Sequence, residues 1–511
     1  MKLGKRNTLH RPVGRGLGLL AAALLLAGCS TQPAYQRPYL DVPENFKQAD
    51  LQHADAGIWF PARHGINDIK PADVPHDWWT LYGDATLNQL QSEAQLQNQG
   101  IAQALARVRA AQAAVASSRS SLFPTVGTSA SGSRARAGGG TMSNAAGENV
   151  ARSGSINNNY SLGLNASWEI DLWGRIAGTV DASEASAQAS RDDLAAVRLS
   201  TQAAVAQTYF SLRAAEAQQS LLQQTLQAYE QSWQLTQNRY KAGVASSADV
   251  AQAESQYKST QAQLIESQTS RAQLEHALAA LLGKVPAAFS LAPTGVMPAP
   301  PAVPSMLPSQ LLEQRPDIAS AERSVAAANA QVGVARAAYF PSLTLSAAAG
   351  YRNSSLSNLL SAPNLFWSLG PALALAIFDG GARDAAVESA RASLDLASAT
   401  YRQTVITALQ EVEDNLVAAN ALDEELQVQT EAVAAARKAL VVANNQYKAG
   451  IVAYLNVLSA QTTVLSAERS LIDVRNRRLA AVNTLLKNVA GDWHTGSSDS
   501  AVSLKDQSAS Q

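Results

Sequence analysis

One short phrase occurs twice in this chain, and its spacing limits what the chain can fold into. Residues 238–243 read NRYKAG and residues 445–450 read NQYKAG, so the two copies lie 207 residues apart. Solenoid repeats have periods of roughly 20 to 50 residues, so this spacing indicates the duplication of a whole half-protein. A fold predicted for the first half is therefore predicted for the second half as well.

The sequence around the first copy predicts a long helical hairpin. A helical pattern runs from Arg175 to about Tyr240, and Gly243 suits the left-handed residue that commonly ends a helix. A second helix is expected from about Ser247 to Leu282. Because the turn between them is so short, the two helices must lie antiparallel.

The second half predicts the same hairpin. Its long helix is expected from about Ala382 to Tyr447, and Gly450 takes the place of Gly243. Leucine or isoleucine then recurs every seven residues, at positions 458, 465, 472, 479 and 486, which is typical of a coiled-coil seam. Since the two long helices have the same predicted length, both hairpins should reach the same depth.

Ahead of each long helix the sequence pattern changes from helical to alternating. From Tyr160 to Leu172 apolar residues fall on even positions and polar residues on odd positions, as in a strand with one apolar and one polar face. Residues 123–133 predict a weaker strand, and residues 134–158 are expected to form a long polar loop. The second half repeats this strand pair in LTLSAAAGY (343–351) and SLGPALALAIF (368–378), with a shorter loop.

The chain therefore divides into two repeats with flanking segments. Each repeat contains a helix, a strand hairpin and a long helical hairpin; the first helix is expected to run unbroken from Asp84, its N-cap, to about Ser120. Seven prolines crowd the stretch between the repeats. The expected segments are a signal peptide (1–28), an N-terminal coil (29–83), the first repeat (84–283), a Pro-rich linker (284–310), the second repeat (311–490) and a polar tail (491–511).

The two strand pairs have a consequence for assembly. Four strands cannot close a barrel, and open strand edges cannot face lipid. The apolar row of Tyr160, Leu162, Leu164 and Trp168 beside a Ser/Gly/Asn row is the alternation of an outer-membrane barrel. Closure then needs strands from other copies, and three copies supply about 12, which leaves room for a water-filled lumen.

The predicted fold class is α+β. It combines a long α-helical coiled-coil barrel with an outer-membrane β-barrel completed by trimerisation, with four strands per protomer and two structural repeats. The alternative is a soluble coiled-coil protein with one β-domain.

The first residues are a targeting segment and not part of the fold. The apolar run from Leu17 to Ala27 is too short to span a bilayer, and the sequence ending in Cys29 (LAGC) resembles a bacterial lipobox. Cleavage before Cys29 and acylation of its thiol are expected; the alternative is a chance cysteine after an ordinary signal peptide. Ser30, by resemblance to Gram-negative lipoproteins, directs export to the outer membrane. Because the chain contains a single cysteine, it can form no internal disulfide.

Charge and motifs argue against nucleic-acid binding and catalysis. Removing residues 1–28 leaves 35 basic and 41 acidic side chains, a net charge of −6, which weakly disfavours nucleic acid as a partner. The sequence contains no Walker loop, no Gly-x-Ser-x-Gly elbow and no HExxH spacing. We expect no enzyme activity and no cofactor, apart from the covalent lipid on Cys29.

Two local features allow two interpretations each. Trp78 and Trp79 are either interfacial anchors or packing residues where the coil meets the helices. Six acidic residues on the second long helix form either a cation-attracting lumen surface or an ordinary solvated face. These are Glu411, Glu413, Asp414, Asp423, Glu424 and Glu425.

Several motifs, in their order along the chain, resemble one family. They are DWWTLYGDATLNQL, FPTV and YFPSL, WEIDLWGR, QRPDIASAE, IFDGGA and both YKAG turns. Together they resemble the TolC-like outer-membrane efflux proteins, in the lipoprotein (NodT-type) branch.

The resemblance implies an assembly and a function. It implies a homotrimer in outer-membrane lipid, with a helical tunnel across the periplasm. It also implies a periplasmic adaptor and an inner-membrane transporter as partners, and passive conduction of drugs or other small molecules. The alternative function is a structural or adhesion lipoprotein with a coiled-coil stalk.

The resemblance also implies that the two YKAG turns are the periplasmic tips, where the tunnel is gated and the adaptor docks. The tip residues are Tyr240, Gly243, Asp249, Tyr447, Gly450, Asn456 and Ser459. In the family a tip aspartate of the first hairpin bonds a tip tyrosine of the second, at positions that match Asp249 and Tyr447. Alternatively, Asp249 only caps the helix that follows. Some members carry two aspartates where this chain has Asn456 and Ser459, so weaker block by multivalent cations is expected here.

Overall fold

The computed structural model describes residues 32–43, 46, 77–136, 138–143, 149–152, 154–301 and 315–489. Cys29, the leader and the tail after residue 489 lie outside the described residues. The chain folds into two compact units, and each unit draws on both repeats. As far as the residues are described, one contains 32–37, 109–188 and 322–399; the other contains 38–108, 189–321 and 400–489.

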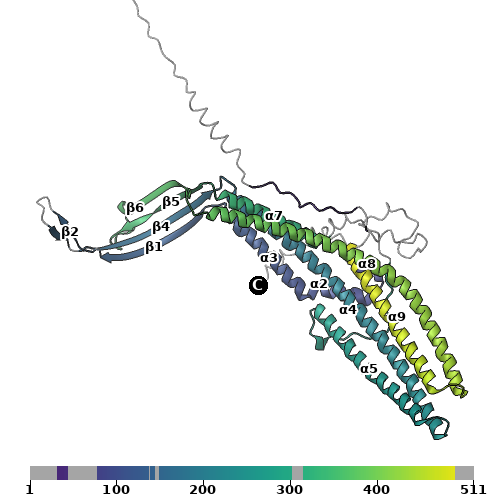
Figure 1. The fold of residues 1–511 in the computed structure, drawn as a ribbon. Helices are drawn as coiled ribbons and strands as arrows, with labels where there is room; N and C mark the ends of the chain where they lie inside the picture. Colours follow the sequence, from purple (N-terminus) through teal and green to yellow (C-terminus); the bar gives the residue numbers. More distant parts are fainter. Residues whose placement is uncertain are drawn as a thin grey trace, which may run out of the picture. The chain divides into compact units, whose positions relative to one another are not determined.

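The first unit is built around a four-stranded antiparallel sheet in the order β1-β4-β5-β6 (Figure 1). β1 (Thr125–Arg136) and β4 (Ile156–Ile170) form the hairpin of the first repeat, and β5 (Ser342–Asn353) and β6 (Leu365–Ala374) form that of the second. β4 joins the two hairpins by pairing with β5. The strands predicted from the alternating pattern are therefore present in both repeats, but the last one ends at Ala374 and does not extend to Phe378 as predicted.

The loop predicted over residues 134–158 is wrong in extent. β1 continues to Arg136 and β4 already begins at Ile156, and two further strands, β2 (Gly140–Ser143) and β3 (Asn149–Arg152), pair within the segment. Main-chain hydrogen bonds between antiparallel strands do not require apolar side chains. A Gly/Ser/Asn-rich sequence therefore hides strands that the alternation test cannot detect.

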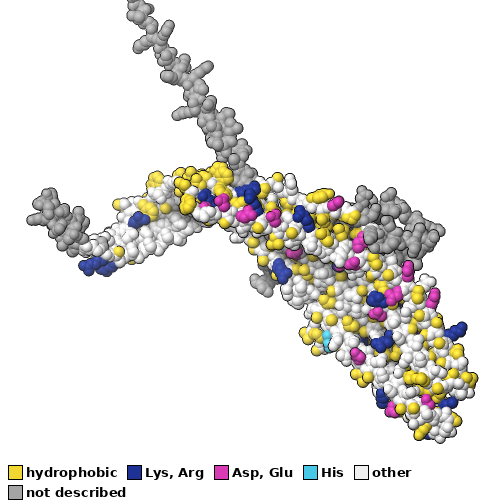
Figure 2. Space-filling model, viewed as in Figure 1, with side chains coloured by type: hydrophobic (Ala, Val, Ile, Leu, Met, Phe, Trp, Pro, Cys, Tyr) yellow, Lys and Arg dark blue, Asp and Glu magenta, His cyan; other side chains and the backbone are white. Residues whose placement is uncertain are grey.

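One face of this sheet is apolar and uncovered. Leu164 is 60 % exposed, and on β6 Trp367 is 75 %, Leu369 is 65 % and Leu373 is 68 % exposed. Figure 2 shows few acidic side chains on the visible side of the sheet, whereas they are frequent over the helices. An apolar row of this size is unusual on a surface that faces water.

The helix predicted to run unbroken from Asp84 to about Ser120 is interrupted in the structure. The structure has two helices instead, α2 (Ala85–Gln97) and α3 (Gln99–Ser120), because Asn98 adopts an extended backbone between them. The Asn98 Nδ2 atom donates to the carbonyl of Leu281 at 2.7 Å, and its Oδ1 accepts from the Ile101 amide at 3.0 Å. A single side chain thus caps α3 and binds the end of a helix 183 residues away.

The long helices match their predicted bounds. α4 spans Arg175–Lys241 and α8 spans Ala382–Lys448, each of 67 residues. The hairpins are completed by α5 (Ser247–Leu281) and α9 (Tyr454–Val489), and α7 (Pro316–Ala337) precedes β5. Short 3-10 turns occur at Trp78–Tyr82, Pro286–Ala288 and Ala362–Asn364. Within the described ranges, no helix is both long and apolar enough to cross a bilayer.

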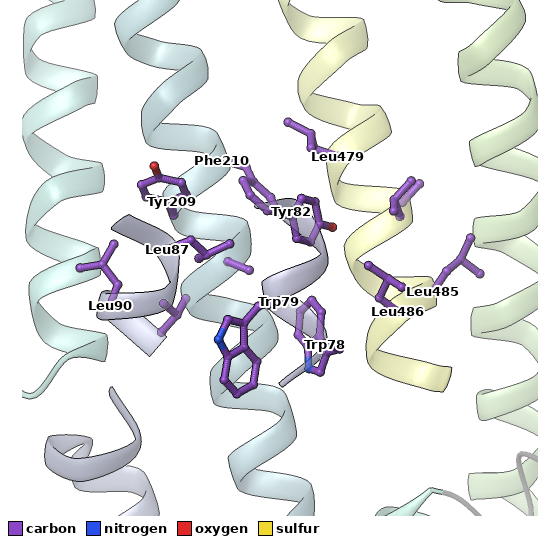
Figure 3. Close-up of a cluster of buried hydrophobic side chains, with 14 of the residues drawn as sticks. Trp78, Trp79, Tyr82, Leu87, Leu90, Tyr209, Phe210, Leu479, Leu485 and Leu486 are labelled. Carbon is purple, nitrogen blue, oxygen red and sulfur yellow. The ribbon is translucent and has the colours of Figure 1, made fainter. Parts of the chain in front are cut away.

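The main core of the second unit forms around the 3-10 turn Trp78–Tyr82 (Figure 3). Trp78 is fully buried and Trp79 is 3 % exposed, packed with residues of α2, α4 and α9 such as Leu87, Phe210 and Leu486. Both tryptophans are therefore packing residues, and the interpretation as interfacial anchors is wrong. Burying such large rings contributes several kcal/mol, on the order of 3–5 by truncation.

Three of the six acidic residues of the α8 cluster are seen in ion pairs. Glu411 accepts from Lys487 at 2.6 Å and from Arg315 at 2.9 Å. Burial alone would raise the pKa of Glu411, but these two cations outweigh it and lower that pKa. Arg315 also pairs with Asp317 at 2.6 Å. Similar pairs join Asp423 to Arg478 and Glu425 to Arg477. These pairs compensate the charge of Glu411, Asp423 and Glu425, so these three side chains form neither a free cation-attracting surface nor a purely solvated face.

Candidate functional site: the hairpin tips

The first tip is a helix end closed by a left-handed glycine. Gly243 has φ +75°, and the amides of Gly243 and Val244 donate to the carbonyls of Tyr240 and Arg239, both at 2.9 Å. These bonds satisfy carbonyls that the end of α4 would otherwise leave unpaired. The prediction that Gly243 ends this helix is confirmed.

Asp249 lies in the first turn of α5 and forms a capping box with Ser246. The Ser246 amide and hydroxyl donate to Asp249 Oδ2 at 3.0 and 2.8 Å, and the Asp249 amide donates to Ser246 Oγ at 3.1 Å. Such a box satisfies amides at the start of a helix. Within one protomer the capping alternative for Asp249 is therefore observed. Both bonds from Ser246 reach the same oxygen, so Oδ1 can still accept another donor.

The second tip repeats the turn but not the cap. Gly450 has φ +74°, and its amide donates to the Tyr447 carbonyl at 3.0 Å. Ala453 and Asn456 stand where the first tip has Ser246 and Asp249, 207 residues earlier. An alanine side chain cannot accept a hydrogen bond, so α9 begins without the serine cap that α5 has. An N-cap of this kind contributes about 0.5–2 kcal/mol.

The tyrosines of the two turns differ in their surroundings. Tyr240 is 51 % exposed, whereas Tyr447 is 6 % exposed. The Tyr447 ring meets Tyr454 edge-on at 5.6 Å between centroids, and the Arg239 guanidinium lies 4.8 Å from its centroid. Tyr447 and Tyr454 form a small core with Ala253 and Val457, and this core joins the two hairpins at the tips.

The Tyr447 hydroxyl is buried, and among the residues that the structure describes it has no hydrogen-bond partner. The expected bond between Asp249 and Tyr447 is thus not formed within one protomer. The neighbouring Tyr454 hydroxyl accepts a long bond of 3.4 Å from Ser232. Burial raises the pKa of Tyr454, so this hydroxyl is uncharged at physiological pH.

Asn456 and Ser459 are both exposed, on the first two turns of α9. Neither side chain carries charge, so the second tip offers no carboxylate at these two positions. Over the described part of the chain, no group of three or more His, Cys, Asp or Glu side chains is arranged to hold a metal ion.

Three tip residues were not identified from the sequence: Ser246, Arg239 and Tyr454. Ser246 had a signal, since Ser-x-x-Asp before a helix is a capping-box pattern. Arg239 and Tyr454 had none, because their roles depend on contacts between the two hairpins.

The family model described as "Outer membrane efflux protein" matches residues 90–284 and 307–491, one segment for each repeat. The chain belongs to the outer membrane efflux protein family.

Individual relatives extend over nearly the whole channel. The probable efflux pump outer membrane protein TtgC of Pseudomonas putida is 31 % identical over 495 residues, which cover 96 % of this chain and 98 % of TtgC. The cation efflux system protein CusC of Escherichia coli is 29 % identical over 474 residues, covering 92 % and 97 %. The solved structure of the outer-membrane channel OprN superposes with a TM-score of 0.78 at 30 % identity, covering 91 % of this chain and all of that one.

Membership of this family confirms several predictions. The fold class is that of the outer-membrane channels: an α+β chain whose helical barrel and four-stranded sheet are completed by trimerisation. The protein is an outer-membrane efflux channel with a periplasmic extension, and not an enzyme. The alternative of a structural or adhesion stalk is set aside, because the match spans both repeats.

Proposed function

We propose that three copies of this channel form the exit duct of a tripartite efflux system. A periplasmic adaptor docks at the hairpin tips and connects the duct to an inner-membrane transporter, which supplies the energy. Drugs or other small molecules then pass through the duct passively and unchanged.

One observation carries the proposal for the tips as the docking site. Both long helices have 67 residues and end in the same YKAG turn, so one trimer presents six tips that share this turn. A Cβ atom added at Gly243 or Gly450 would have nothing within 4 Å. The two turns therefore offer open backbone surface that a partner can approach closely.

We infer that the closed gate uses the tip groups that a single protomer leaves available. The Tyr447 hydroxyl has no acceptor in this arrangement and Asp249 Oδ1 can provide one, so we expect the two to meet when the tips rearrange in the closed trimer. A neutral donor on a carboxylate contributes roughly 1.5–3 kcal/mol. Exposed Asn456 and Ser459 leave the adjoining levels of the entrance uncharged.

The lack of carboxylates at positions 456 and 459 supports organic molecules as cargo in preference to metal cations. Relatives carry both kinds of name: a toluene efflux pump outer membrane protein of Pseudomonas putida, and the cation efflux protein CusC. Rings of carboxylates attract cations, and positions 456 and 459 supply none.

Acylation of Cys29 completes the proposed arrangement. The lipid would hold the start of the mature chain at the periplasmic leaflet of the outer membrane. Anchoring would be stable, because the acyl chains add to a barrel that is itself embedded.

The docking proposal is tested by adding side chains at the two tip glycines. Asparagine tolerates positive φ, so Gly243→Asn with Gly450→Asn keeps the turns while adding bulk to the open surface. The proteins are expressed with an adaptor and transporter in a Gram-negative host that lacks its own efflux channels, and dye accumulation is measured.

We expect the double variant to form trimers by native mass spectrometry and to conduct normally in a planar bilayer, yet to lose most dye efflux. Leu96→Asn, at an exposed position on α2, is the matched control and should keep efflux. Full efflux by the double variant would refute docking at these turns. A wild-type protein that neither trimerises nor conducts would refute the channel itself.

A further inference from the structure

The apolar face of the four-stranded sheet, which faces lipid in an outer-membrane barrel, has a defined height. On β4 its apolar row runs from Ile170, at the end nearest the helices, to Tyr160, ten residues earlier. At about 3.4 Å per residue and a strand tilt of about 35–45°, this row spans about 24–28 Å across the membrane. The apolar band of such barrels is about 25 Å tall. The band of this barrel therefore ends at the level of Tyr160.

Aromatic residues mark both limits of the band. Near the helical end Trp168 lies on this face, and its indole N–H donates to the Leu122 carbonyl at 3.0 Å. Near the opposite end Tyr160 on β4 and Tyr351 on β5 lie on the same face. Rings of this kind form the two girdles of an outer-membrane barrel. Because the helices extend into the periplasm, Tyr160 and Tyr351 mark the outer leaflet.

Two arginines continue the lipid-facing side beyond this outer girdle. Gly132 of β1 lies opposite Tyr160, and the next two positions of β1 on the same face are Arg134 and Arg136. At the same rise and tilt, their α-carbons lie about 5 and 10 Å beyond the girdle. These depths fall within and just outside the polar headgroup region of a bilayer.

No acidic side chain balances these two charges in the described strands. Both arginine side chains are exposed, and neither has an ion pair or hydrogen bond among the described residues. In the strands as described, Glu169 is the only acidic residue, and it lies at the helical end of β4. Figure 2 shows basic side chains gathered at the end of the sheet away from the helices, with no acidic side chain visible beside them. The patch therefore suits an anionic partner.

We propose that Arg134 and Arg136 bind the phosphate groups of the lipopolysaccharide that forms the outer leaflet around the barrel. The arginine fork binds a phosphate through two parallel N–H bonds. The two residues share one face and lie about 7 Å apart along β1, so both can reach one headgroup. The lipid would hold the barrel from the outer leaflet, opposite the proposed acyl anchor on Cys29. This inference goes beyond conduction and does not depend on adaptor docking at the tips.

Arg352 provides a matched comparison at the same end of the sheet. It lies on β5 opposite Ser161, in the polar row that faces the water-filled lumen. Its guanidinium lies 5.0 Å from the centroid of the Phe366 ring. Arg352 has the same charge as Arg134 and lies near the same level, but on the other face. It should therefore contribute nothing to the binding of an outer-leaflet lipid.

Titration of the purified trimer with lipid A, the phosphorylated anchor of lipopolysaccharide, tests the site. The delipidated full-length protein is held in a neutral detergent, and bound lipid is counted by native mass spectrometry. The variants are Arg134→Gln alone, Arg134→Gln with Arg136→Gln, and the control Arg352→Gln. A lysine pair, Arg134→Lys with Arg136→Lys, keeps the charge but lacks the fork.

We expect the glutamine pair to bind lipid A at least about tenfold more weakly, since each Lys or Arg near an anionic surface contributes roughly fivefold in affinity. Arg134→Gln should lose part of this affinity, and Arg352→Gln should bind as wild type. Dephosphorylated lipid A should bind the wild type as weakly as lipid A binds the glutamine pair. Inorganic phosphate in large excess should not displace lipid A.

Equal binding of lipid A by the wild type and the glutamine pair would overturn the site. Equal binding of phosphorylated and dephosphorylated lipid A by the wild type would overturn phosphate recognition, and displacement by inorganic phosphate would overturn the lipid as the ligand. If the glutamine pair forms no trimers, the lysine pair serves instead: it should bind more weakly than the wild type, and unchanged affinity would count against the site. A wild-type protein that forms no trimers would refute the channel itself, which is a separate result.

Discussion

Because the Tyr447 hydroxyl has no partner within a protomer, removing it can test the proposed gate bond without lowering the free energy of unfolding of the protomer. Tyr447→Phe keeps the ring that packs against Tyr454 and Arg239 and removes only the hydroxyl. A buried hydroxyl without a partner costs about 1–3 kcal/mol, so its removal should leave the free energy of unfolding of a protomer unchanged or raised. A gate bond to Asp249 in the closed trimer would be lost at the same time.

The expected size of the effect follows from the same bond. Three such bonds close one trimer, and each contributes roughly 1.5–3 kcal/mol. Since about 1.4 kcal/mol corresponds to a tenfold change in an equilibrium constant, losing even one bond should raise the open population at least about tenfold. Tyr447→Phe should therefore open more often without being less stable.

The assay measures opening frequency in a planar bilayer together with thermal unfolding of the purified trimer. Tyr240→Phe is the matched control, because this residue occupies the same place in the other turn but its side chain is 51 % exposed. We expect Tyr240→Phe to behave as wild type in both measurements. Unchanged opening of Tyr447→Phe with unchanged stability would refute the lock, and would leave Asp249 with its capping role alone.

Four further predictions follow from other parts of the molecule. Cys29→Ser should abolish palmitate labelling but keep part of the efflux activity, since the barrel also anchors the trimer; unchanged labelling would refute acylation at this residue. Asn456→Asp with Ser459→Asp should create block by trivalent cations added on the periplasmic side of a bilayer, and equal block of the wild type would contradict the idea. Trp78→Ala should lower the free energy of unfolding by about 3–5 kcal/mol in denaturant titrations, because the indole is fully buried; a loss below about 1 kcal/mol would contradict its place in the core. Burial alone would raise the pKa of Asp317, but the ion pair with Arg315 outweighs burial and holds this pKa below its usual value. The stabilising contribution of the ionised carboxylate is therefore present above pH ~4 and is lost as the pH falls further. Asp317→Asn should flatten the fall in melting temperature below pH ~4.

Much of this protein was determined by its sequence alone. The ends of the long helices depend on local residues, and Gly243 and Gly450 end them where the sequence predicted, because only a residue that tolerates positive φ fits there. The strands of both hairpins follow from alternation, and the duplication makes each half a check on the other. The tip positions Asp249, Asn456 and Ser459 came from the resemblance to the efflux family and not from the turns themselves.

The tertiary structure decided whatever depends on contacts between distant segments. Tyr240 and Tyr447 occupy equivalent turns, yet only Tyr447 is buried, because α9 and Arg239 lie against it. Asn98 breaks a helix whose local sequence is helical, because its side chain binds the end of α5. The acidic side chains of α8 meet cations from remote parts of the chain, as Glu411 meets Arg315. Periodicity reports which face of an element is apolar, but it carries no information about which distant side chain will lie against that face.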